Sequence, residues 1–250
     1  MTYKDLTDRY AGSALGVFWA LFYPLLLVGI YVLIFTFIFK VNLGGQVQSQ
    51  PLEYALYAIV GLVAFISMQE GLVRSTSSIL SNATLVKQVV FPIDILPIIG
   101  ILVSFTTLVI GFVIYLFISA TLVREHLSVL ALLLPLVIFL HFIFSVGIGW
   151  ILAGVAAYFR DLKELITIFL FLGMFVTPVL YSDQMVPAAL YWPFQINPMT
   201  HLINMYRDVL FYGHINHPWS FLVFSILSIV IFLLGFSFFQ KVKHFFANIL

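Results

Sequence analysis

A short charged segment in the second half of the chain constrains the fold most strongly. Residues 159–164, Phe-Arg-Asp-Leu-Lys-Glu, hold four charged side chains between two long apolar runs. Each charge at the centre of a bilayer costs roughly 2.5–3.5 kcal/mol, so a membrane-spanning helix cannot contain this cluster. The segment is therefore predicted to be a turn in water between two spans. Two of its charges are basic, which favours the cytoplasmic side. The turn is either an ordinary solvated loop or a contact point for a cytoplasmic partner.

Composition agrees with a membrane protein. The 250 residues are 63% hydrophobic and only 8% charged, whereas soluble domains average about 25% charged residues. The net charge of +1 gives no sign of nucleic-acid binding, and the absence of cysteine excludes disulfides and thiolate chemistry. We expect an all-α integral membrane protein in which residues 1–250 form one domain.

The apolar runs predict six transmembrane helices, because a span needs about 20 residues. Their expected positions are about 17–39, 54–73, 95–119, 129–157, 165–180 and 219–239. An amphipathic helix on the membrane surface is expected at 1–16. The apolar, proline-rich segment 181–218 is expected to form short helices that lie in, or re-enter, the outer leaflet. The segment 74–94 is expected to be the longest inner loop, with a short docking helix in its second half.

The distribution of basic residues predicts that both termini are cytoplasmic. Eight basic residues then lie in inner segments and three in outer ones. The inner residues are Lys4, Arg9, Arg74, Lys87, Arg160, Lys163, Lys241 and Lys243, and the outer ones are Lys40, Arg124 and Arg207.

Two features inside the expected spans point to helix packing. Glu70 and Arg74 are four residues apart, in the favourable order for an ion pair on one helix. Small or polar residues also recur every fourth position in the helix expected at 129–157, which lets two helices approach closely. This stripe is either an internal packing surface or a subunit seam. We expect its histidine to donate an interhelical hydrogen bond, because no acidic partner for a proton relay lies in mid-span. The stripe consists of His141, Ser145, Gly149, Ala153 and Ala157.

Motifs for catalysis are not found. The chain has no Gly-x-x-x-x-Gly-Lys-Ser/Thr loop, no His-Glu-x-x-His and no Gly-x-Ser-x-Gly. His201, His214 and His217 fall in one outer segment, but without a fixed scaffold or cysteines a metal site is not expected. We expect neither catalysis nor a bound cofactor in this chain.

Several strings, taken in order, resemble bacterial ABC transporter permeases that export polysaccharides. They cover nearly the whole chain. The strings are Arg9-Tyr10-Ala11-Gly12-Ser13-Ala14-Leu15-Gly16 with Trp19 and Pro24; Asn82-x-x-Leu85-Val86-Lys87 with Phe91-Pro92-Ile93-Asp94-Ile95-Leu96-Pro97; Phe159-Arg160-Asp161-Leu162-Lys163 with Thr177-Pro178-Val179-Leu180-Tyr181; and Asn197-Pro198-Met199 with Tyr206-Arg207-Asp208.

The resemblance implies a homodimer of six-span permeases in the bacterial cytoplasmic membrane, served by two copies of a separate ATP-binding subunit. That subunit would hold ATP and Mg, in agreement with the missing phosphate-binding loop in this chain. The implied substrates are glycans linked to a polyprenyl diphosphate, such as O-antigen, teichoic acid or capsule. Contact with membrane lipid is expected, and contact with nucleic acid is not.

Three groups of site residues follow. Contact with the ATP-binding subunit is expected at Thr84, Leu85, Lys87, Gln88, Arg160, Asp161 and Lys163. An outer gate is implied at Asn197, Pro198, Tyr206, Arg207 and Asp208. Aromatic stripes at intervals of four, which either line the glycan path or fill lipid-facing and core positions, are formed by Tyr31, Phe35 and Phe39 and by Phe171 and Phe175.

Two other functions stay open. One is a permease for a drug or a small lipid. The other is a membrane-embedded glycan or lipid enzyme, which would place carboxylates or histidines inward near one interface, whereas the acidic residues here fall mostly in loops. A neighbouring gene for an ATPase, among glycosyltransferase genes, would favour the glycan exporter.

Overall fold

A computed structural model describes residues 51–88, 92–122, 128–182 and 185–246, together with five isolated positions between 26 and 34. The surface helix expected at 1–16 lies outside the described residues, and so does most of the span expected at 17–39. All regular elements in the described ranges are helical, and none is a strand.

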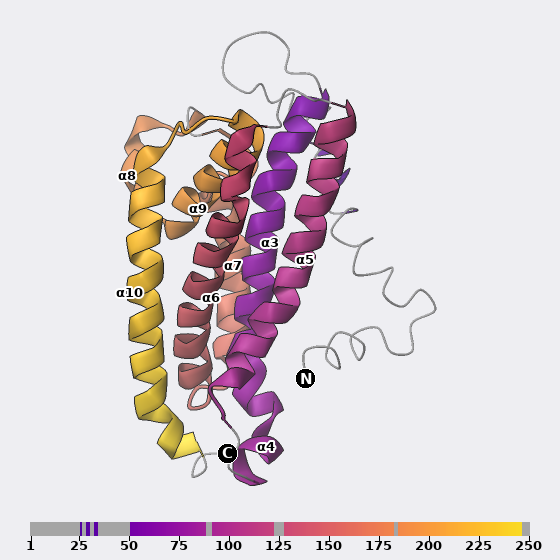
Figure 1. Ribbon diagram of the computed structural model, residues 1–250. Coiled ribbons are helices and arrows are strands. Elements are labelled where there is room, and N and C mark those ends of the chain that lie inside the picture. Colours follow the sequence, from indigo (N-terminus) through magenta and orange to yellow (C-terminus); the bar gives the residue numbers. More distant parts are fainter. Residues whose placement is uncertain are drawn as a thin grey trace.

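Four long helices form the frame of the molecule, and they run side by side along its length (Figure 1). Within the described residues these are the four helices long and apolar enough to cross a membrane. They correspond to the spans expected second, third, fourth and sixth. Their bounds are α3 (Pro51–Ser81), α5 (Ile95–Leu122), α6 (Leu134–Ala156, preceded by the 3-10 helix η3, Val129–Leu133) and α10 (Pro218–Val242, followed by the 3-10 helix η7, Lys243–Phe245).

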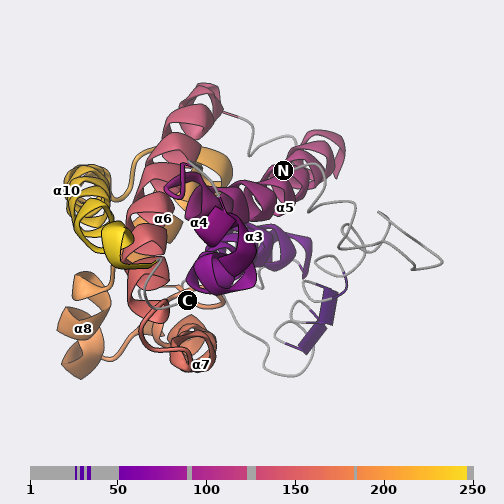
Figure 2. The ribbon, with the colours of Figure 1, turned by 90° about the horizontal axis from the view of Figure 1, so that it is seen from below.

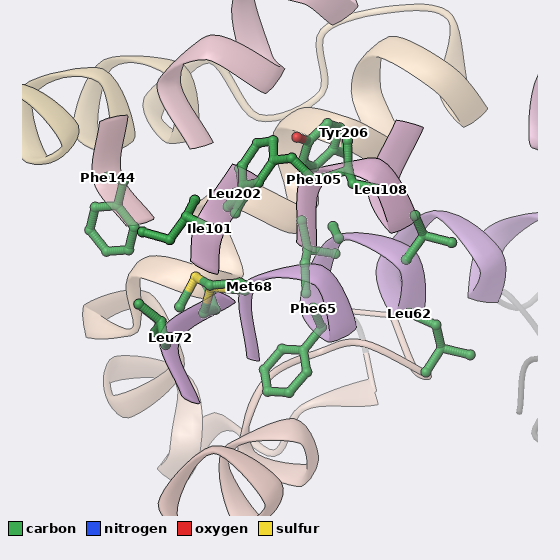
Figure 3. Close-up of a cluster of buried hydrophobic side chains, with 14 of the residues drawn as sticks. Leu62, Phe65, Met68, Leu72, Ile101, Phe105, Leu108, Phe144, Leu202 and Tyr206 are labelled. Carbon is green, nitrogen blue, oxygen red and sulfur yellow. The ribbon is translucent and has the colours of Figure 1, made fainter. Parts of the chain in front are cut away.

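Helix α3 is the central element, because it packs against α5, α6 and α9 (Pro198–Arg207). Figure 3 shows apolar side chains from these helices meeting in one core, among them Phe65 of α3, Phe105 of α5 and Leu202 of α9. Burial of such side chains fixes the relative positions of the helices. Helix α10 contributes less to this core, since only 17% of its most apolar window is buried.

Close backbone contact joins α6 to α10. A Cβ atom added at Gly147 would lie 2.5 Å from the carbonyl oxygen of Ile231, and one added at Gly235 would overlap the carbonyl of Gly147. These two glycines therefore allow the helix backbones to touch, as small residues do in membrane helix pairs.

The stripe of small residues on α6 is an internal packing surface. His141, Ser145, Gly149, Ala153 and Ala157 are all buried, and a Cβ added at Gly149 would meet Ser75 and Ile101. His141 makes an interhelical hydrogen bond, with its Nδ1 3.1 Å from the Tyr206 hydroxyl; that His141 is the donor stays a prediction. The ion pair expected on α3 is also present, with Arg74 Nη2 2.9 Å from Glu70 Oε1.

The predicted inner loop at 74–94 is wrong for its first part, because α3 continues to Ser81. Hydroxyl groups in this stretch bond to the helix itself: Thr76 donates to the Leu72 carbonyl at 2.7 Å and Ser78 to that of Ser75 at 2.7 Å. Serine and threonine can be accommodated in a helix in this way. The short helix expected in the second part is present as α4 (Ala83–Gln88).

The span expected at 165–180 corresponds to α7, which runs from Leu162 to Val176. It begins within the charged segment and ends before Pro178, because Thr177 is extended, as residues before proline usually are. Its 15 residues rise about 22 Å, less than the roughly 30 Å hydrocarbon core. The six-span count therefore stays a prediction.

Short helices follow α7, as the sequence predicts, and they lie at the end of the bundle opposite α4 (Figure 1). Their position relative to a membrane leaflet stays a prediction. They are η5 (Ala188–Leu190), α8 (Tyr191–Ile196), α9 and the π-helical turn η6 (Asp208–Tyr212).

Candidate functional site

The charged segment is a tight turn between α6 and α7, as predicted. Leu162 N donates to the Phe159 carbonyl at 3.2 Å and Glu164 N donates to that of Asp161 at 3.2 Å. Arg160 and Asp161 are exposed, as is Lys163 in the first turn of α7. Four charges are thus presented on a short, hydrogen-bonded turn, which suits either solvation or contact with a polar partner surface.

Helix α4 lies at the same end of the bundle as this turn (Figure 1). Figure 2 looks at this end and shows α4 over the end of α3. Thr84 and Lys87 are exposed and Leu85 is half-buried, while Val86 is buried with 7% of its surface accessible. The predicted contact residues on α4 and on the turn therefore share one end of the molecule. Gln88 is the last residue of α4.

At the opposite end, three side chains hold three consecutive backbone carbonyls just after α7. Arg207 Nη2 donates to the Val179 carbonyl at 2.7 Å. The Tyr54 hydroxyl donates to the Leu180 carbonyl at 2.9 Å, and the Tyr57 hydroxyl to that of Tyr181 at 3.0 Å. We call these three side chains and the three carbonyls the carbonyl clamp. It fixes the exit of α7 to α3 and α9.

The guanidinium of Arg207 is the charged centre of the clamp. The side chain is 1% exposed, and its Cζ lies 3.6 Å from the centroid of the Tyr57 ring. A desolvated contact of this kind contributes about 2 kcal/mol or more. Gly61 leaves room for the guanidinium, because a Cβ there would lie 3.1 Å from Arg207 Nη2. The positive charge is thus stabilised by an aromatic face and a carbonyl dipole.

The other predicted gate residues bond in different directions. Asn197 caps α9 through Met199 N at 3.0 Å and donates to Thr177 Oγ1 at 2.8 Å, so it also contacts the exit of α7. Tyr206 contacts α6 through His141. Asp208, fully buried, accepts from the backbone N of His217 at 2.8 Å and lies 2.9 Å from its Nδ1.

The predicted gate thus divides into two parts. Asn197 and Arg207 are brought together at the exit of α7, while Tyr206 and Asp208 join α9 and η6 to other elements. Pro198 occupies the first turn of α9, where proline is favoured because its missing N–H is not needed.

Residues of α3 were missed by sequence reasoning. Tyr54, Tyr57 and Gly61 complete the clamp, and their spacing of three and four places them on one helical face. That spacing is the signal that would have marked them as a unit.

The aromatic pair on α7 faces outward. Phe171 and Phe175 are 53% and 55% exposed, with ring centroids 5.7 Å apart. Another face of α7, with Ile166 and Leu170, lines an apolar groove of about 700 Å³ shared with α3, α6 and α8. The aromatic pair is therefore available to a partner chain, to lipid or to a substrate. Tyr31, Phe35 and Phe39 lie outside the described residues.

The histidines expected not to bind metal make separate contacts. His201 lies 2.8 Å from the Gln195 carbonyl and His214 2.8 Å from that of Tyr212, while His217 contacts Asp208. Among the residues that the structure describes, no three His, Cys, Asp or Glu side chains form a group that could hold a metal ion.

Comparison with known proteins identifies the family. The sequence profile of the ABC-2 type transporter family matches residues 1–211. An O-antigen export system permease protein of Klebsiella pneumoniae is 30% identical over 254 residues, covering 100% of this chain and 93% of the relative. A protein of the same name from Myxococcus xanthus is 25% identical, covering 98% and 92%.

A polysialic acid transport protein of Escherichia coli is 23% identical, covering 95% of this chain and 90% of the relative. The matches thus extend along nearly the whole chain, through both ends of the bundle described above. The chain belongs to the ABC-2 type transporter family of multi-pass membrane transport subunits.

Proposed function

We propose that this chain is the transmembrane subunit of an ABC exporter that moves a polysaccharide across the bacterial cytoplasmic membrane. The observation that carries the proposal is the end-to-end similarity to O-antigen export permeases. O-antigen is the preferred substrate class for that reason. The polysialic acid relative makes a capsule-type glycan the second choice, and teichoic acid remains the third.

The proposed assembly is a homodimer with two copies of a separate ATP-binding subunit that holds ATP and Mg. Each permease has six spans, with the first at about 17–39 and the fifth at α7, and α8 and α9 re-enter the outer leaflet. Both termini are cytoplasmic. The exposed outer face of α7, with Phe171 and Phe175, supports a contact with a second permease or with substrate.

Energy from ATP hydrolysis reaches the permease at the end of the bundle that carries α4 and the α6–α7 turn. Exposed polar groups on both elements support this assignment: Thr84 and Lys87 on α4, Arg160 and Asp161 on the turn. A basic and an acidic residue side by side can pair with complementary charges on a partner, and such pairs fix orientation more than they add affinity.

The glycan path is proposed to run along aromatic side chains. Sugars present flat C–H faces that pack on aromatic rings, while their hydroxyls are served by tyrosine and by water. Phe171 and Phe175 supply such a surface on α7, and Tyr31, Phe35 and Phe39 are proposed to supply the facing one. The polyprenyl diphosphate carrier would follow the same route at the membrane interface.

Deletion of this chain in its own host tests the function. We expect surface glycan to disappear while lipid-linked glycan accumulates inside the cell, because synthesis continues without export. Complementation with this chain should restore surface glycan only when the neighbouring ATP-binding subunit can hydrolyse ATP. If glycan is lost both inside and outside, the chain is an enzyme of synthesis; if glycan is unchanged, the chain exports something else. Either result overturns the proposal.

A further inference from the structure

Asp94 joins three helices at the end of the bundle that carries α4. It lies in the turn before α5, and its carboxylate accepts a hydrogen bond from Gln240 Nε2 at 2.9 Å. Lys243 Nζ lies 3.2 Å from Oδ1 and 3.0 Å from Oδ2. The main-chain carbonyl of Asp94 accepts from Trp150 Nε1 at 3.0 Å. One residue thus bonds to α6, to α10 and to the first residue after α10.

The partners of Asp94 are themselves well placed. The Trp150 ring packs against Phe232 and Phe236 of α10, with centroids 5.2 and 5.3 Å apart, so α6 and α10 form one surface. Gln240 lies near the end of α10, and Lys243 is the first residue after it. The carboxylate therefore meets a preformed set of donors, and its position relative to the long helices is fixed.

Helix α4 has little anchorage of its own. Of its residues 83–87, Val86 alone is buried, and the Asn82 amide before the helix donates to the Ser78 carbonyl at 2.8 Å. A six-residue helix cannot hold its place by helix propensity, since isolated helices shorter than about 12 residues are marginal in water. Its orientation therefore depends on where the described chain on either side of it is fixed, at Asn82 on α3 and at Asp94, six residues after Gln88.

We propose that Asp94 is a positioning residue that holds α4 in the orientation needed to bind the ATP-binding subunit. The inference rests on the proposed function. In this proposal the end of α10 also helps to position α4, because Gln240 and Lys243 bind the Asp94 carboxylate. The ion pair is partly exposed, with 25% of the Asp94 side chain and 22% of that of Lys243 accessible, and pairs of this kind contribute little to stability. Its loss should therefore affect assembly more than folding.

Charge reversal with rescue tests the proposal in the complete complex. Asp94→Lys should reduce co-purification of the ATP-binding subunit about tenfold, equivalent to about 1.4 kcal/mol, because it replaces the attraction to Lys243 by repulsion. Surface glycan should fall in the same direction. The amount of permease in the membrane and its unfolding temperature in detergent should stay unchanged. Lys243→Asp alone should act in the same direction. The double variant with both reversals should recover co-purification and export, because the ion pair is restored with opposite polarity.

Lys241 provides the matched control, since it is exposed on α10 two residues from Lys243. Asp94→Lys with Lys241→Asp has the same net charge as the double reversal but does not restore the pair, so it should not recover. The isosteric variant Asp94→Asn removes the charge but keeps an oxygen that can accept from Gln240. This variant is used for the co-purification measurement if Asp94→Lys does not reach the membrane.

Three results would overturn the proposal: full co-purification with Asp94→Lys, no recovery in the double reversal, or equal recovery with Lys241→Asp. A purely structural role would instead lower the unfolding temperature and membrane level in parallel with co-purification. Failure of the proposed function appears separately, as wild-type protein that leaves surface glycan unchanged.

Discussion

Gly61 lies where a single methyl group should open the carbonyl clamp. A Cβ atom at this position would be 2.6 Å from the Val179 carbonyl oxygen and 3.1 Å from Arg207 Nη2. These two atoms form the 2.7 Å hydrogen bond at the charged centre of the clamp. Gly61→Ala must therefore displace the backbone at Val179, since a backbone carbonyl cannot yield by rotating a side chain, and this displacement disturbs the bond to the guanidinium.

The size of the effect follows from three terms. A hydrogen bond from a charged donor is worth roughly 1.5–3 kcal/mol. Overpacking in a well-packed region costs typically about 1–3 kcal/mol, and part of this is the same displacement. Alanine gains about 1 kcal/mol over glycine in helix propensity. If the overpacking is the same displacement that breaks the hydrogen bond, the net loss of stability is about 0.5–2 kcal/mol, concentrated at the exit of α7.

Gly173→Ala is the matched control, because it makes the same chemical change in α7. A Cβ there comes no closer than 4.0 Å to its nearest neighbour, Phe65 Cζ, so only the propensity gain remains. We expect Gly61→Ala to lower the unfolding temperature in detergent and reduce surface glycan, and Gly173→Ala to lower neither. Equal behaviour of the two variants would show that the clamp tolerates a methyl group, and the argument from close contact would be wrong.

Three further predictions concern the clamp, the turn and the topology. Tyr57→Phe keeps the ring over Arg207 and should lower the stability by about 1 kcal/mol, because one hydrogen bond is lost. Tyr57→Leu also removes the cation–π contact and should lower the stability by about 2 kcal/mol more. Equal unfolding temperatures of the two variants would contradict this. Arg160→Glu with Asp161→Arg should abolish export or release the ATP-binding subunit, and normal export with normal assembly would make the turn a solvated loop. The chain has no cysteine, so single introduced cysteines can be labelled from outside with an impermeant reagent; we expect labelling at positions 46, 124 and 214, and only after permeabilisation at 84, 162 and 243.

Bilayer energetics made much of the fold readable from the sequence. The cost of charge in hydrocarbon predicted the turn around Arg160, and uninterrupted apolar runs predicted the four long helices. The same rule failed at 74–81. A stretch rich in serine and threonine looks like a loop when its hydroxyls are counted as groups that need water. In the structure, the hydroxyls of Thr76 and Ser78 donate hydrogen bonds to carbonyls of their own helix. No local sequence pattern predicts these bonds.

The clamp and the Asp94 attachment were harder to predict for a different reason. Each joins residues far apart in sequence: Tyr54 lies 126 positions from Leu180, and Asp94 lies 149 from Lys243. Local spacing could group Tyr54 with Tyr57 and Gly61 on one face, but it cannot show which carbonyls that face will meet. In the clamp the acceptors are backbone atoms, which carry no residue-type signal at all.

The string Tyr206-Arg207-Asp208 shows what such a motif can mean on a helix. Consecutive helical residues point about 100° apart, so three neighbours cannot converge on one site. Here Tyr206 reaches His141 of α6, Arg207 reaches the exit of α7, and Asp208 reaches His217 at the start of α10. Arg207 and Asp208 carry opposite charges, yet each bonds elsewhere. The string therefore makes the end of α9 and the start of η6 a junction between three elements, and a displacement of the exit of α7 must be taken up by α3 and α9 together.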